Sequence, residues 1–192
     1  LQVLMLKPIL LVEDNPNDLE LTLIALSKSQ LANQVIIVRD GAEALDYLHR
    51  RGEYASRPAG NPAVVLLDLK LPKVDGLEVL REIKKSKPKL PVLVLSMHPE
   101  GQFAVRVLKR GASGYMTKES APEELVGAIK KVLAGGRYVS PSLAEKLATY
   151  LSADGQKPPQ EKLSDREFQV LRLIASGKIV SEIAKELSLS VK

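Results

Sequence analysis

The sequence of 192 residues contains no cysteine and no tryptophan, and only 4% of it is aromatic. Without cysteine, the chain can form neither disulfides nor thiolate metal sites, and it has no cysteine nucleophile. The absence of disulfides suits a reducing cytoplasm. Because 45% of the residues are nonetheless hydrophobic, the core must be built from leucine, valine, isoleucine and alanine.

Long apolar runs are also missing, since no stretch approaches the roughly 18 apolar residues that a transmembrane helix needs. The first six residues, LQVLML, lack the basic region and the small-residue cleavage site of a signal peptide. We therefore expect a cytoplasmic protein that neither spans a membrane nor is secreted. Its net charge of +5 permits nucleic-acid binding, but it fits equally well a soluble protein with a few surplus lysines.

Short apolar runs alternate with helical patterns up to about residue 134. The runs are residues 8–12, 35–38, 63–67, 91–95 and 114–116. The helical patterns are residues 16–27, 41–50, 76–85, 101–110 and 122–134. Runs that are continuous rather than alternating indicate strands covered on both faces. Their alternation with helices predicts a doubly wound α/β domain with a five-stranded parallel sheet.

The pattern changes after residue 134. A helix is predicted from Pro141, capped by Ser140, and the polar, Pro- and Gly-rich residues 152–162 resemble an exposed linker. A small all-α unit follows, with a second helix at about 180–187. Helical spacing predicts the buried face of its first helix: Phe168, Leu171, Ile174 and Ala175.

Polar side chains follow the predicted strands where each strand ends. They are Glu13 and Asp14, Asp68, Ser96, and Thr117 and Lys118. Each alone has an ordinary explanation, such as a helix cap, a turn residue or a solvated lysine. Carboxyl ends of parallel strands meet at one edge of a sheet, however, so these groups are expected to converge there.

The residue types in this set limit the kind of chemistry that the site could perform. Oxygen ligands, without cysteine or a suitable histidine pair, indicate a hard cation such as magnesium. An ionised aspartate is already a nucleophile, and a metal, a lysine and a hydroxyl beside it suit phosphoryl transfer. The spacing therefore predicts a metal-assisted aspartyl-phosphate site.

The segments VEDNPND, LLDLKLPKVDGLEVL, VLVLSMH and GYMTKES resemble the receiver domains of bacterial two-component response regulators. The resemblance covers residues 7–135 and implies a flavodoxin-like fold. It also implies that a sensor histidine kinase phosphorylates Asp68. The magnesium ligands that it implies are Glu13, Asp14, Asp68 and the backbone carbonyl of Lys70.

Further roles follow from the same resemblance. Lys118 would contact the phosphoryl oxygens, the hydroxyl of Ser96 would turn toward them, and Tyr115 would follow as an aromatic switch. An ordinary core tyrosine is the alternative for Tyr115. His98 lies at a position that tunes dephosphorylation in this family, or else it is a loop residue.

Residues 163–192 resemble the start of a LuxR/NarL-type helix-turn-helix output domain, joined through a linker with one helix at residues 136–162. The resemblance implies transcriptional control, with promoter DNA as a partner where the helix-turn-helix is complete, and a homodimer. The recognition helix would follow residue 192, so its DNA-reading residues are not identified. The front half is closer to stand-alone receivers associated with phytochrome kinases, so the chain has the pattern of a mosaic.

Two other functions remain open from the sequence. The chain fits a signalling module that docks to a partner protein without DNA output. A haloacid-type phosphatase also uses an aspartate and magnesium, but Lys70 stands where such enzymes carry their second acid. We therefore expect a phosphoacceptor with intrinsic autophosphorylation and slow autodephosphorylation, and not a turnover enzyme.

Overall fold

The computed structural model describes residues 7–28, 33–97, 102–152, 165–175 and 178–187. The chain divides into two units, Leu1–Thr149 and Tyr150–Lys192, which are described separately. Among the described residues, no helix has both the length and the hydrophobicity needed to cross a bilayer.

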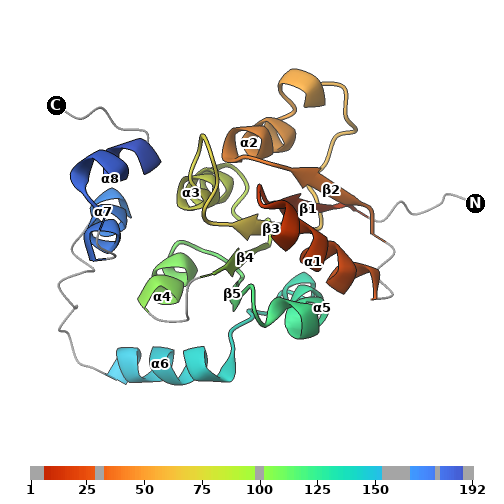
Figure 1. The fold of residues 1–192 in the computed structure, drawn as a ribbon. Helices are drawn as coiled ribbons and strands as arrows, with labels where there is room; N and C mark the ends of the chain where they lie inside the picture. Colours follow the sequence, from red (N-terminus) through yellow and green to blue (C-terminus); the bar gives the residue numbers. More distant parts are fainter. Residues whose placement is uncertain (1–6, 29–32, 98–101, 153–164, 176–177, 188–192) are drawn as a thin grey trace, which may run out of the picture. The chain divides into compact units, whose positions relative to one another are not determined.

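The first unit is built on a five-stranded parallel sheet with the order β2-β1-β3-β4-β5 (Figure 1). The strands are β1 (Ile9–Val12), β2 (Val35–Val38), β3 (Val64–Asp68), β4 (Val92–Ser96) and β5 (Gly114–Thr117). All residues of β1, β3 and β4 are buried, whereas β2 lies at an edge and is buried only at Val38. The predicted fold class is confirmed.

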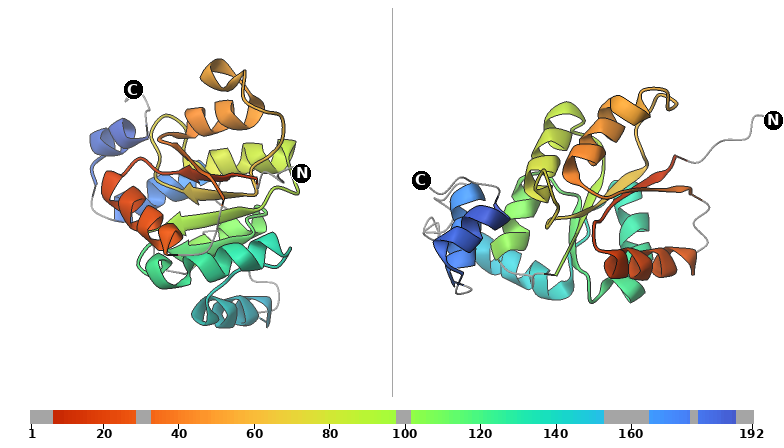
Figure 2. Two further views of the ribbon diagram at one scale, coloured as in Figure 1. Left: turned by 90° about the vertical axis from the view of Figure 1, so that its right-hand side faces the viewer. Right: turned by 45° about the horizontal axis from the view of Figure 1, so that its top comes forward.

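Five helices cover the two faces of this sheet (Figure 2). They are α1 (Pro16–Ser27), α2 (Gly41–His49), α3 (Gly76–Ser86), α4 (Gln102–Lys109) and α5 (Ala121–Leu133). Successive side chains of a strand point to opposite faces, so Leu10 and Val12 pack with α2, α3 and α4. Ile9 and Leu11 pack with α1 and α5. The short 3₁₀ helix η1 (Gly52–Tyr54) lies between α2 and β3.

The segment after α5 returns to the sheet before the next helix begins. The backbone N–H of Tyr115 donates to Tyr138 O at 3.2 Å, and the N–H of Tyr138 donates to Ser113 O at 2.9 Å. Helix α6 (Pro141–Ser152) then starts, and its Leu143 is fully buried in the cluster that contains Tyr115. The beginning of α6 is thus part of the first unit.

The second unit contains α7 (Asp165–Ala175) and α8 (Val180–Glu186). The prediction that Leu171 and Ile174 are buried is wrong, since they are 42% and 55% exposed, and Ala175 is exposed too. Leu173 is buried instead, together with Ile183 and Ala184 of α8. Leu173 lies two positions after Leu171, which corresponds to a rotation of about 200° around the helix axis. The buried face of α7 is therefore nearly opposite to the predicted one. The side chain of Phe168 lies outside the described residues.

Candidate functional site

The strand order itself creates the place where the polar residues meet. Strands β1 and β3 are neighbours, but the chain leaves β1 toward β2 on one side and continues from β3 to β4 on the other. In open parallel sheets, sites form at the carboxyl ends of the strands at such a reversal of order. Glu13 and Asp14 follow β1, and Asp68 is the last residue of β3.

These three acids form a compact cluster. One carboxylate oxygen of each lies within 4.8 Å of the others. Glu13 and Asp68 are buried, whereas Asp14 is exposed. Burial raises the pKa of Glu13 to about 7, against the effect of Lys118, and the nearby charge of Asp68 adds to the increase. Burial also raises the pKa of Asp68, although Lys118 and the backbone N–H of Leu69 lower it.

Lys118 reaches this cluster from the end of β5. Its Nζ lies 2.7 Å from Glu13 Oε2 and 3.1 Å from Asp68 Oδ2. Its backbone N–H donates to Ser96 O at 2.9 Å, which aligns the ends of β4 and β5. Burial alone would lower the pKa of Lys118, but the surrounding carboxylates raise it above its ordinary value. Lys118 is therefore a fixed positive charge at the carboxyl end of β3.

The loop after β3 holds Asp68 in place. Asp68 Oδ1 accepts a hydrogen bond from the backbone N–H of Leu69 at 2.7 Å, and Gly76 N donates to Leu69 O at 3.0 Å. A Cβ on Gly76 would lie only 2.3 Å from the carbonyl oxygen of Asp68. Glycine is therefore required where the loop closes against β3. Lys70, whose carbonyl is a predicted ligand, lies in the same loop and is exposed.

Ser96 and Tyr115 are both buried on adjacent strands, β4 and β5. Tyr115 lies opposite Val94 in the parallel register, and Val94 is two residues before Ser96 on the neighbouring strand. Its ring packs in the same cluster as Ala104 of α4 and Leu143 of α6. The predicted switch tyrosine thus lies between the site and the start of the linker helix. His98, for which a tuning role was predicted, lies outside the described residues.

The residues fit a divalent cation such as Mg²⁺. Three carboxylates gather their oxygens around one point, and a hard cation prefers oxygen donors. Glu13 Oε2 is buried and lies 2.7 Å from Lys118 Nζ, but it meets no further hydrogen-bond donor among the described residues. A buried carboxylate oxygen without a donor is costly unless a cation or proton compensates it.

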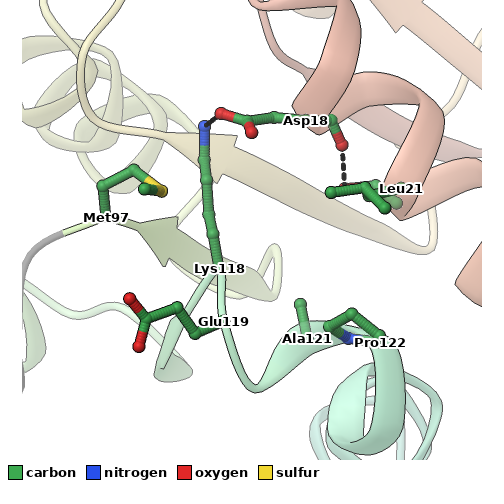
Figure 3. Close-up of a pocket in the computed structure, with 8 residues that line it drawn as sticks. Asp18, Leu21, Met97, Lys118, Glu119, Ala121 and Pro122 are labelled. Carbon is green, nitrogen blue, oxygen red and sulfur yellow. Dashed lines mark hydrogen bonds and ion pairs between the residues drawn. The ribbon is translucent and has the colours of Figure 1, made fainter.

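The sequence patterns did not indicate Asp18, which belongs to the same constellation. Asp18 lies in the first turn of α1, and its Oδ2 accepts a hydrogen bond from Lys118 Nζ at 2.8 Å (Figure 3). Both residues line a cavity of about 160 Å³ together with Met97 and Pro122. An acid in a first helical turn ordinarily interacts with the helix dipole, so its position alone did not distinguish it.

Comparison with known proteins identifies the family. The family described as response regulator receiver domain matches residues 9–130, and the luxR family of bacterial regulatory proteins matches residues 161–192. The chain belongs to the response regulators with a receiver domain. Response regulator GacA of Pseudomonas aeruginosa is 42% identical over 132 residues, which make up 68% of this chain and 62% of GacA. The chain spans about 60% of the length of the curated relatives it matches.

Two solved structures resemble different lengths of the chain. The bacteriophytochrome response regulator AtBRR is 52% identical, and the match covers 70% of this chain and 96% of AtBRR with a TM-score of 0.61. A structure of two RcsB dimers bound to two parallel DNAs is 26% identical and covers 96% of this chain and 84% of RcsB with a TM-score of 0.64. The first match covers nearly all of AtBRR, and the second extends over nearly the whole of this chain.

Proposed function

We propose that this chain is a phosphorylation-controlled transcription regulator in which Asp68 accepts a phosphoryl group from a sensor histidine kinase. The observation that carries the proposal is the arrangement around Asp68. Its carboxylate ends β3 beside a lysine at 3.1 Å and beside Glu13 and Asp14. This is the set of groups that phosphoryl transfer needs, because the protein's task there is to position the nucleophile and to stabilise charge.

The transfer is a substitution at phosphorus. A carboxylate oxygen of Asp68 forms a bond to phosphorus, while the bond from phosphorus to the donor nitrogen of the kinase histidine breaks. The electron pair of the broken bond stays with that imidazole. Lys118 and the hydroxyl of Ser96 then bind oxygens of the transferred group.

Glu13, Asp14, Asp68 and the backbone carbonyl of Lys70 are the proposed ligands of Mg²⁺. The ion would offset the negative charge that the acids and the incoming phosphoryl group bring together. The chain is then a phosphoacceptor that catalyses only its own phosphorylation and slow dephosphorylation, in the cytoplasm.

The proposed output passes through the linker helix. The receiver would comprise residues 7–135, the linker residues 136–162 and the DNA-binding unit residues 163–192. Tyr115 and Leu143 pack in one cluster, so a shift of the tyrosine after phosphorylation would change how the start of α6 packs against the receiver. The luxR match at residues 161–192 and the similarity to a DNA-bound RcsB dimer support promoter DNA and a second copy of this chain as partners.

A receiver that acts by docking to a partner protein, without DNA output, is the second candidate. The match to AtBRR favours it, because it covers 96% of that response regulator but only 70% of this chain. A gel-shift assay separates the two candidates. Tight, sequence-specific retention of DNA would exclude the docking module, whereas weak, sequence-independent retention that falls with salt would indicate residual DNA contact only.

The phosphoacceptor is tested by the intact mass of the protein after incubation with acetyl phosphate and Mg²⁺. The wild type should gain one phosphoryl group, and it should not do so when Mg²⁺ is chelated. The Asp68→Asn variant should gain none. Unchanged Mg²⁺-dependent phosphorylation of that variant would show that Asp68 is not the acceptor.

A further inference from the structure

Lys118 has three carboxylate partners, and one of them stands apart from the proposed metal ligands. Nζ lies 2.7 Å from Glu13, 2.8 Å from Asp18 and 3.1 Å from Asp68. The contact with Asp18 is a hydrogen bond, and the contact with Glu13 is a close ion pair. Lys118 therefore links the end of β5 to Asp18 on α1, and its contact with Asp68 is the longest of the three.

Asp18 is held in this position by its own helix. Asn15 caps α1, and its Oδ1 accepts hydrogen bonds from the backbone N–H groups of Asn17 and Asp18 at 2.9 and 3.4 Å. The hydroxyl of Thr22 donates to the carbonyl oxygen of Asp18 at 2.8 Å. The side chain of Asp18 then spans from α1 to the end of β5 (Figure 3). It is 20% exposed, the most of the three acids that contact Lys118.

A phosphoryl group on Asp68 must compete for this lysine. An ammonium group has three N–H donors, and three carboxylates already surround Nζ. Phosphorylation adds three strong acceptor oxygens beside Asp68. The contact with Asp68 can pass to one of these oxygens, but Lys118 can donate to a second one only if it gives up Glu13 or Asp18.

The burial of the three acids decides which partner is released. Glu13 is only 1% exposed, so the loss of its counter-ion would leave a buried charge uncompensated, which is costly. Asp68 carries the phosphoryl group itself. Asp18 borders the cavity of about 160 Å³ and is partly exposed, so water can replace the lysine there.

We propose that Asp18 is a positioning residue that holds Lys118 on α1 in the unphosphorylated protein and competes with the phosphoryl group for it. The proposal rests on the proposed phosphoryl chemistry of Asp68. In this proposal, α1 takes part in the site directly, because phosphorylation breaks the hydrogen bond between Lys118, after β5, and Asp18 on α1. A hydrogen bond between two charged groups is exchanged for another one, so Asp18 reduces the affinity for the phosphoryl group without preventing its binding.

The test is the dissociation constant of beryllofluoride, which imitates a phosphoryl group on an aspartate, at saturating Mg²⁺. Asp18→Asn keeps the shape of the side chain but replaces a charge-assisted hydrogen bond by a weaker neutral one. We expect it to bind beryllofluoride about three- to tenfold more tightly than the wild type. The control is Glu20→Gln, which removes the same charge from an exposed position of α1 and should leave the constant unchanged. Equal or weaker binding by Asp18→Asn, or equal tightening by Glu20→Gln, would overturn the proposal.

A second variant pair separates the lysine from a general effect of charge. In a Lys118→Ala background, Asp18 has no ammonium group to hold, so Asp18→Asn should no longer tighten binding. Tightening of the same size in that background would show that Asp18 acts through its charge alone and would contradict the proposal. If the wild type itself fails to bind beryllofluoride, the proposed function fails. If the wild type binds and Asp18→Asn equals it, only the role of Asp18 fails.

Discussion

At the scale of single residues, Glu13 is a carboxylate whose charged form is disfavoured by burial. Its carboxylate is buried next to Asp68, and burial raises its pKa to about 7 although Lys118 lies 2.7 Å away. Residues that serve a site are often unfavourable for the fold. The sequence predicted that Glu13 belongs to the site, because it follows an apolar strand and precedes another acid. It gave no indication of Asp18, whose role depends on a lysine 100 residues away.

The first prediction concerns the stability of a Glu13→Gln variant in metal-free buffer. Burial raises the pKa of Glu13 from 4.5 to about 7, so the folded state binds this proton more tightly than the unfolded state. Stability attributable to Glu13 therefore falls as the pH rises from about 4.5 to 7. The variant lacks this loss, and above pH 7 it should be more stable by the order of 1–3 kcal/mol.

Thermal unfolding of both proteins between pH 4 and 8 measures this difference. The two midpoints should lie close together near pH 4 and separate as the pH rises. Added Mg²⁺ should stabilise the wild type more than Glu13→Gln, because the variant lacks one proposed ligand. A variant that is less stable than the wild type at pH 8 would show that Lys118 compensates the charge of Glu13 fully.

The second prediction concerns the glycine that closes the loop after β3. A Cβ on Gly76 would lie 2.3 Å from Asp68 O and 2.6 Å from Leu69 Cα. Both are backbone atoms, so the strand end must move. Gly76→Ala should lower the free energy of unfolding by about 2–4 kcal/mol and slow phosphorylation of Asp68.

Gly127→Ala is the matched control, because a Cβ on Gly127 would meet no atom within 4 Å. Gly127 lies inside α5, where alanine is favoured over glycine by about 0.5–1 kcal/mol. Urea denaturation should therefore show opposite changes for the two variants. A Gly76→Ala protein as stable as the wild type would mean that the loop rearranges at little cost.

At the scale of helices and strands, local patterns predicted where elements lie but not what they pack against. Every strand of the first unit and each of α1 to α5 begins and ends within one residue of the predicted boundary. Continuous apolar runs and helix caps are local signals, so they are visible in the sequence. The burial of Leu143 beside Tyr115 and of Leu173 in place of Leu171 depends on which surface each helix meets. That surface is formed by residues far away in the sequence.

The third prediction concerns this contact between α6 and the sheet. Leu143 is fully buried in the cluster of Tyr115 and Ala104, so Leu143→Ala should destabilise the first unit by about 2–4 kcal/mol. Leu133→Ala serves as the control, since Leu133, at the end of α5, is 41% exposed and should cost much less. Urea denaturation compares them. Equal effects of the two substitutions would show that α6 does not stabilise the receiver in solution.

At the scale of the whole molecule, the proposed function requires that phosphorylation of Asp68 act on surfaces outside the receiver. The proposed path runs through Lys118 and Ser96 at the strand ends, Tyr115 within β5, and Leu143 at the start of α6. Phosphorylation would then shift the equilibrium between two packing arrangements and would not add a new chemical step. Coupling between phosphorylation and assembly is then a free energy that acts in both directions.

The last prediction uses this reciprocity. If phosphorylation favours the proposed homodimer, beryllofluoride with Mg²⁺ should strengthen dimerisation in sedimentation experiments by about 5- to 150-fold. Because a dimer binds two beryllofluorides, thermodynamic linkage requires the affinity of each protomer to rise by the square root of that factor as the protein concentration crosses the dimer dissociation constant. Asp68→Asn should show neither effect. Leu143→Ala should keep beryllofluoride binding but lose most of its dependence on protein concentration, because the path from Tyr115 to α6 is interrupted. Dimerisation that is equally strong with and without beryllofluoride would show that the phosphoryl site does not control assembly.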